Sequence, residues 1–140
     1  MIRIVTESMS DFTQEEAKAA DLIVMPLPIR IGMEEYWDDG VSLTQDDFYA
    51  RLRVAKELPK TSQVPVEHYR KCFNRLLENP EDEVLVITGS SKLSGCYQSA
   101  CIAREACHDP ARVTVLDSLN ATCAEYMLVA QALRYRREAV

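Results

Sequence analysis

Residues 84–100 read VLVITGSSKLSGCYQSA, and this stretch decides the fold of the chain. The apolar, mostly β-branched run at 84–87 is typical of a buried strand. Residues 99–106 are small or helix-forming, so they predict a helix. A serine- and glycine-rich loop that joins a strand to a helix presents backbone N–H groups at the positive end of the helix dipole. The stretch therefore suits a carboxylate, a phosphate or an oxyanion.

The bulk composition fits one globular domain with a core of its own. The chain has 140 residues, of which 47% are hydrophobic and 27% are charged, and its net charge is −6. This negative charge argues against non-specific binding to nucleic acid, which needs an excess of Lys and Arg. No window approaches the run of about 20 apolar residues that a membrane span requires. The first residues lead directly into a strand without a signal-peptide pattern, so we expect a cytoplasmic protein.

The cysteines and histidines do not form a recognisable metal or disulfide pattern. There are five cysteines, with no C-x-x-C pair, and His68 and His108 lie outside ligand spacing. We therefore expect reduced thiols and neither a metal nor a cofactor. Cys96 stands in the serine-rich stretch, and it is the one thiol for which the sequence suggests partial exposure and reactivity.

Strand and helix patterns alternate along the chain. Strands are expected at 2–6, 22–28, 84–87 and 112–116. Helices are expected at 13–20 and 45–56, and a third from 65 to just before Pro80. A fourth helix follows the serine-rich loop and ends at about 107, and a fifth begins at about 121. Gly32-Met33 between two extended arms predicts a type II′ hairpin. The alternation predicts a single α/β domain: a three-layer αβα arrangement with a mostly parallel sheet, plus a small β-hairpin.

Two finer expectations concern the helices. Thr13 and Glu16 form a capping-box pattern, which places the start of the first helix. In the last helix, a set of mostly apolar residues is spaced for one face: Ala124, Met127, Leu128, Gln131 and Tyr135.

Hydroxyl groups gather where the strands are expected to end. Ligands of open α/β sheets bind beyond the carboxyl ends of the strands. Residues 6–8, 90–95 and 117–118 follow three of the strands, and the loop 61–63 could reach the same edge. Lys92 is the one nearby cation, so hydroxyls and amides would hold an anion there. Taken singly, Ser10, Thr13 and Ser42 are interpreted as caps or turn residues.

Catalysis by the same segment is the competing hypothesis. A serine between a strand and a helix is typical of a nucleophile elbow, but residues 89–93 have Leu93 where G-x-S-x-G requires glycine. A serine nucleophile also needs a positioned base, and both histidines are predicted away from this edge. We therefore expect no catalytic residue. A phosphate or ester enzyme, and a scaffold domain that docks a partner, stay open as alternatives.

Five motifs give the chain a resemblance to a known family. Residues 90–100, SSKLSGCYQSA, are close to S-S-x-L-S-G-T-Y-Q-S-A, and residues 58–63, LPKTSQ, match P-x-T-S-Q. TESMSD at 6–11, DGV at 39–41 and VLDS at 115–118 follow the same family pattern. In this order, across essentially all 140 residues, the chain resembles the N-terminal domain of the bacterial DegV family. The resemblance implies that residues 1–140 form one such domain and that the family's C-terminal domain is absent.

The resemblance also implies a function. DegV-like proteins bind one long-chain fatty acid without catalysing a reaction, and some present its carboxylate to a separate fatty-acid kinase. Four positions are implied as carboxylate ligands, namely Thr61, Ser62, Ser94 and Gly95, with Ser8, Ser91, Asp117 and Ser118 supporting them.

The sequence departs from the family pattern at several positions. Glu7 replaces an aspartate, and Cys96 replaces a threonine. Residues 123–126, CAEY, replace a smaller, glycine-containing run and are expected to narrow the acyl channel.

Overall fold

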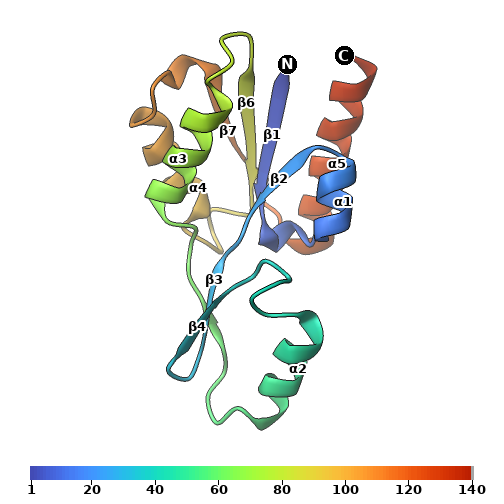
Figure 1. Cartoon of the computed structure of the whole chain (residues 1–140), viewed down its shortest axis with the longest axis vertical. Helices are drawn as coiled ribbons and strands as arrows, with labels where there is room; N and C mark the ends of the chain where they lie inside the picture. Colours follow the sequence, from blue (N-terminus) through green and yellow to red (C-terminus); the bar gives the residue numbers. More distant parts are fainter. Residues whose placement is uncertain (140) are drawn as a thin grey trace.

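A four-stranded parallel sheet forms the centre of the domain. The computed structural model describes residues 1–139. The strand order is β2 (Leu22–Met25), β1 (Ile2–Glu7), β6 (Glu83–Thr88) and β7 (Val113–Asp117), and neighbouring strands are all parallel. All four strands end at the edge that faces the lower part of the molecule in Figure 1.

Helices cover both faces of this sheet, so the predicted three-layer αβα arrangement is confirmed. Figure 1 shows α3 (Val66–Leu76) and α4 (Cys96–Glu105) on one side, with α1 (Gln14–Ala19) and α5 (Thr122–Glu138) on the other. Within residues 1–139, no helix combines the length and the apolar character needed to cross a bilayer.

A second, antiparallel sheet lies below the first. It consists of β4 (Glu34–Trp37), β3 (Pro28–Ile31) and β5 (Lys60–Thr61), and α2 (Gln45–Val54) packs nearby (Figure 1). The hairpin at Gly32-Met33 is confirmed, and only Gly32 of the two has a positive φ, +63°, as a type II′ turn requires. Short 3₁₀ turns occur at η1 (Ser8–Ser10) and η2 (Pro110–Arg112).

The strand β5 was not expected, because the sequence predicted a loop there. Its two residues pair with β3 through Ile29 opposite Thr61 and Arg30 opposite Lys60. A strand this short has no periodicity of its own, and its conformation is set by the partner strand. The pairing fixes the position of Thr61, one of the predicted carboxylate ligands.

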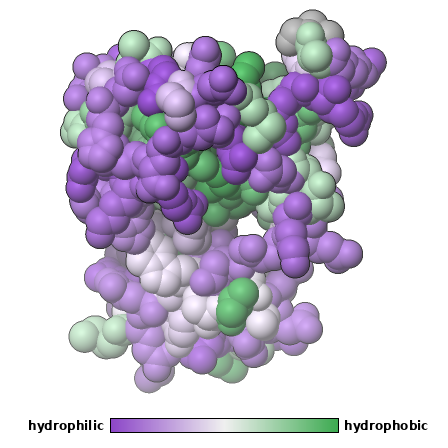
Figure 2. Space-filling view, turned by 45° about the horizontal axis from the view of Figure 1, so that its top comes forward, coloured by the Kyte–Doolittle hydropathy of each residue, from purple (hydrophilic) through white to green (hydrophobic). Residues whose placement is uncertain are grey.

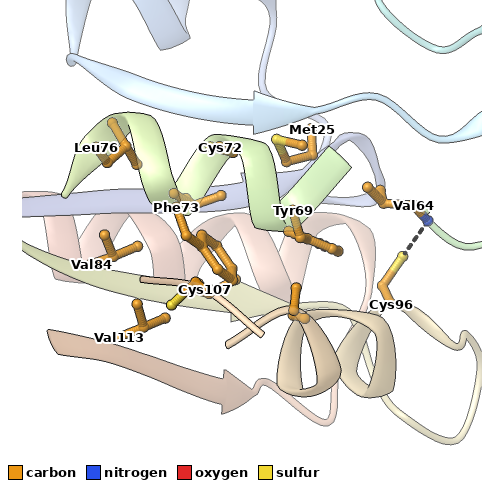
Figure 3. Close-up of a cluster of buried hydrophobic side chains, with 14 of the residues drawn as sticks. Met25, Val64, Tyr69, Cys72, Phe73, Leu76, Val84, Cys96, Cys107 and Val113 are labelled. Carbon is orange, nitrogen blue, oxygen red and sulfur yellow. Dashed lines mark hydrogen bonds between the residues drawn. The ribbon is translucent and has the colours of Figure 1, made fainter. Parts of the chain in front are cut away.

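Two apolar clusters fill the space between the layers. The larger lies between the sheet and the α3–α4 layer and is centred on Tyr69 and Phe73, both fully buried. Figure 3 shows Phe73 extending from α3 toward the strands that carry Val84 and Val113. The smaller cluster lies under α1 and α5 and contains Ile4, Ala17, Leu22, Ile87 and Val129. The five cysteines are free thiols, as expected.

The inward face of α5 differs from the expected one. Met127 is 65% exposed and Leu128 is 40% exposed, whereas Glu125 and Val129 are fully buried. The apolar spacing therefore marked the outer face. The prediction of the buried face failed because Glu125 occupies an inward position. A pattern that counts only apolar residues assigns a glutamate to the exposed face.

The capping box at the start of α1 gives a direct test of local stability. Thr13 Oγ1 accepts a hydrogen bond from the Glu16 N–H at 3.1 Å, and the Glu16 carboxylate accepts one from the Thr13 N–H at 2.9 Å. Thr13→Ala is expected to lower the free energy of unfolding by about 1 kcal/mol in urea denaturation. Thr13→Ser, which retains the oxygen, should keep most of that stability. Equal losses in both variants would contradict the role of the cap.

Candidate functional site

Two segments that are distant in sequence meet below the central sheet. The segment after β5 (residues 62–64) lies against the start of α4. The Val64 N–H donates to Cys96 Sγ at 3.4 Å, as Figure 3 shows. Gly95 faces the side chain of Gln63, and a Cβ at Gly95 would lie 3.2 Å from Gln63 Cδ. The structure thus brings Gln63 and Val64, which follow Thr61 and Ser62 in the chain, against Gly95 and Cys96.

Most backbone N–H groups of the serine-rich loop already have acceptors inside the domain. The Gly89 N–H donates to the Glu7 carboxylate, the Ser90 N–H to Asn120 O at 2.7 Å, and the Ser91 N–H to Asp117 Oδ1 at 3.1 Å. The next three N–H groups of the loop bond to Ser90 itself. The loop is therefore held in place and does not surround an anion with its own amides.

The free donors lie at the N-terminus of α4. Within residues 1–139, the N–H groups of Gly95, Tyr97 and Gln98 have no hydrogen-bond acceptor. The Ser94 hydroxyl accepts from the Cys96 N–H at 3.2 Å, which leaves its own proton available to donate. This cluster of donors at the positive end of a ten-residue helix is suited to an anion.

Thr61 and Ser62 come directly before the two residues that meet this helix end, Gln63 and Val64. Both are exposed, and within residues 1–139 their hydroxyls make no hydrogen bond. The Ser62 N–H donates to Pro28 O at 3.2 Å, which ties the segment to the second sheet. Their hydroxyl groups are therefore free to bind a ligand.

The predicted supporting residues Asp117, Ser118 and Ser8 do not all lie at the same place. Asp117 accepts from the N–H groups of Ser91 and Leu119, at 3.1 and 3.0 Å. Burial acts to raise the pKa of Asp117, but hydrogen bonds from Ser91 and Leu119 outweigh it and hold that pKa below its ordinary value. The Ser118 hydroxyl is used within its own turn, where it donates to Asn120 O. Ser8 lies elsewhere, because its Oγ accepts from the Leu27 N–H.

A groove of about 990 Å³ lies between the two parts of the molecule, and it shares Thr61 with the candidate anion site. Thr61 and Ser8 line it together with the apolar Ile29, Leu43 and Phe48, whereas Ser94 and Gly95 do not. Figure 2 shows hydrophobic surface gathered above the lower part, within a mostly hydrophilic face. The groove also has four acidic side chains, those of Asp11, Glu15, Asp38 and Asp39. These acids disfavour a bound carboxylate, so the helix end is the better anion site.

The expectation of a reactive Cys96 is wrong. Its side chain is fully buried, and burial raises the pKa of the thiol. Packing of Val64 against the start of α4 covers the sulfur, which sequence position alone could not reveal. Neither histidine lies beside the serines of the loop: His68 packs beside Trp37, and the backbone N–H of His108 bonds to Asn74. No group of three potential metal ligands occurs in the same residues.

Sequence reasoning missed two buried acids beneath the loop. Glu7 is the last residue of β1 rather than part of a polar loop, and Gly89 donates to it. Glu125 was expected to narrow an acyl channel, but it points into the domain and accepts from the Thr6 hydroxyl at 3.2 Å. One signal was available: Glu125 lies four residues before Val129, so both belong to one helix face.

Comparisons with known proteins settle the family. The model of a family described as "Uncharacterised protein, DegV family" matches residues 1–139. The chain belongs to the DegV family. It is 40% identical over 133 residues to a DegV domain-containing protein from Caldanaerobacter subterraneus, covering 95% of this chain and 46% of that one. A Thermotoga maritima relative named fatty acid-binding protein is 35% identical over 130 residues, covering 88% and 42%.

Solved structures of DegV proteins have the same fold. A stearic acid-binding protein from Eubacterium ventriosum superposes with a TM-score of 0.91 at 29% identity, over 100% of this chain and 49% of that one. A DegV family protein from Thermus thermophilus, described by its fatty acid binding, gives 0.88 at 32% identity, over 99% and 48%. This DegV chain spans about half the length of the relatives it matches.

Proposed function

We propose that this DegV domain binds the carboxylate of a long-chain fatty acid at the N-terminus of α4. Ser94 and the free N–H groups that begin at Gly95 contact the carboxylate from one side, and Thr61 and Ser62 contact it from the other. The observation that carries the proposal is the set of unpaired donors at Gly95, Tyr97 and Gln98, next to a hydroxyl with a free proton. The fatty acid-binding descriptions of the relatives support it.

Neutral donors are sufficient for this ligand. The helix dipole contributes about 0.3–1 kcal/mol and each hydrogen bond about 1 kcal/mol. An acyl chain with about 14 buried CH₂ groups contributes on the order of 11 kcal/mol before the costs of binding. Most of the affinity thus comes from burial of the acyl chain, and the polar groups of the protein orient the carboxylate. Leu93, 71% exposed next to Ser94, provides apolar surface beside the proposed site.

The weakly charged site also fits a carrier role. A carboxylate held by hydroxyls and amides, without an arginine or lysine pair, keeps its oxygens available for transfer. The domain would then present the fatty acid to a separate fatty-acid kinase and catalyse no reaction itself.

Removing the Ser94 hydroxyl should weaken stearate binding. Ser94→Ala is expected to reduce affinity about 5–10-fold, because one hydrogen bond is worth about 1 kcal/mol, while Thr114→Ala on the exposed edge strand should have no effect. Binding is measured by native mass spectrometry and by calorimetric titration with stearate. No stearate bound by the wild-type chain, or unchanged affinity in Ser94→Ala combined with Thr61→Val, would refute the proposed function.

A further inference from the structure

A pair of buried carboxyl groups lies directly beneath the serine-rich loop. Glu7 ends β1 and Glu125 lies in the first turns of α5, and both residues are fully buried. The Glu7 carboxylate accepts from the Gly89 N–H, at 3.0 Å to Oε1 and 3.2 Å to Oε2. Glu125 Oε1 accepts from the Thr6 hydroxyl, whereas Oε2 has no donor within residues 1–139. Both carboxyl groups lie at Gly89, since its N–H bonds to Glu7 and a Cβ on it would lie 3.2 Å from Glu125 Oε2.

No positive charge compensates this pair. Within residues 1–139, neither acid has a Lys or Arg nitrogen within 4 Å. The ionisable groups that face the pair are Asp11 after η1, Tyr69 on α3 and Cys96 on α4, and none of them is a cation. Two adjacent carboxylates in a buried site cannot both be ionised at a low cost. One of them must therefore keep its proton.

The hydrogen-bond pattern indicates which acid is protonated. Glu7 receives a backbone donor, which favours its ionised form. Glu125 has a buried oxygen without a donor, and a proton on this oxygen would turn it into a donor for Glu7. Burial and then the hydrogen bond and charge of Glu7 raise the pKa of Glu125 to about 10. Burial also raises the pKa of Glu7, although hydrogen bonds from Glu125 and Gly89 oppose the rise.

We propose that Glu7 and Glu125 share one proton in the folded domain and form a proton-dependent clamp at the base of the serine-rich loop. The protonated Glu125 donates to Glu7, and Glu7 holds the Gly89 N–H, so β1, the loop and α5 are joined in one chain of hydrogen bonds. Gly89 permits this approach, since a Cβ there would lie 3.2 Å from Glu125 Oε2. The clamp does not depend on which ligand the loop holds.

The clamp makes folding stability depend on pH in a defined direction. In the unfolded chain Glu125 ionises near its ordinary value of 4.5, whereas in the folded domain it keeps its proton up to about pH 10. Between these values the folded state binds one more proton than the unfolded state. The contribution of Glu125 to stability is therefore fully present below about pH 4.5 and is lost as pH rises toward about 10, and over this range it increases the unfolding constant by up to about tenfold per pH unit.

The substitution Glu125→Gln tests this proposal. The amide has the same shape, can donate to Glu7 and accept from Thr6, and has no proton to lose. We expect urea unfolding between about pH 6 and about pH 9 to lose the wild-type slope of up to tenfold per pH unit. Glu57→Gln, at an exposed position of the chain, is the matched control and should keep the wild-type slope.

Two further measurements keep the test decisive if Glu125→Gln folds poorly. Glu7→Gln should also reduce the slope, because its amide can donate to an ionised Glu125. Infrared spectra of the wild-type domain at neutral pH should contain a protonated buried carboxyl band that disappears in Glu125→Gln. The proposal is overturned if Glu125→Gln and Glu7→Gln both keep the wild-type pH slope of the unfolding constant. It is also overturned if the wild-type domain at neutral pH has no protonated carboxyl band.

Discussion

Phe73→Ala is expected to lower the free energy of unfolding by about 3–5 kcal/mol, the range observed when a large aromatic side chain is removed from a core. Phe73 is fully buried between α3 and the central sheet, and its ring centroid lies 5.7 Å from that of Tyr69. Neighbours on rigid strands cannot move in to fill the space, so a cavity stays behind. The loss would also loosen the α3–α4 layer, which includes the start of α4 at the proposed site.

Urea denaturation followed by circular dichroism measures this loss. Phe48→Ala is the matched control, because Phe48 is half-buried on α2, a helix without a fully buried residue. Its cost should be clearly smaller. Similar losses for the two substitutions would mean that the α3–α4 cluster is not the main source of stability.

Gly89→Ala should give the second largest effect, a loss of about 1–3 kcal/mol from overpacking. A Cβ at Gly89 would lie 2.4 Å from Met9 Sδ and 3.2 Å from Glu125 Oε2. The partly buried Met9 side chain must shift against the larger core cluster, and the fully buried Glu125 leaves the new methyl group little room. Thermal unfolding of the substituted domain measures the loss.

Gly95→Ala separates this steric effect from a general loss of glycine. Its Cβ would meet the side chain of Gln63, an exposed residue that can adopt another rotamer. We expect almost unchanged stability and weaker stearate binding, because Gly95 borders the free N–H groups. Equal destabilisation by the two alanines would contradict the close packing described at Gly89.

Features set by local chemistry could be predicted from the sequence. The capping box at Thr13, the hairpin at Gly32 and the alternation of strands with helices depend on residues close together in the chain. Features set by distant partners could not. The strand at Thr61 exists because β3 is beside it, and Cys96 is buried because Val64 packs on it.

The same distinction between local residues and distant partners applies to the candidate site. The motifs directed attention to Ser94 and Gly95, whose role as ligands stays a prediction, and the structure places Gln63, two residues after Thr61, beside Gly95. The sequence could not show that the loop amides are already hydrogen-bonded, because their acceptors are distant in sequence, at Glu7, Asp117 and Asn120. An acid on the inward face of a helix, such as Glu125, contradicts the usual apolar pattern, so that pattern cannot predict its burial.

The bonded amides of the serine-rich loop have a consequence for the kinetics of ligand capture. Because these amides are bonded to β1, β7 and the turn at Asn120, the loop loses little conformational entropy when an anion arrives. Such a preorganised site needs no slow rearrangement before binding. Differences in affinity among ligands should therefore appear mainly in how fast they leave.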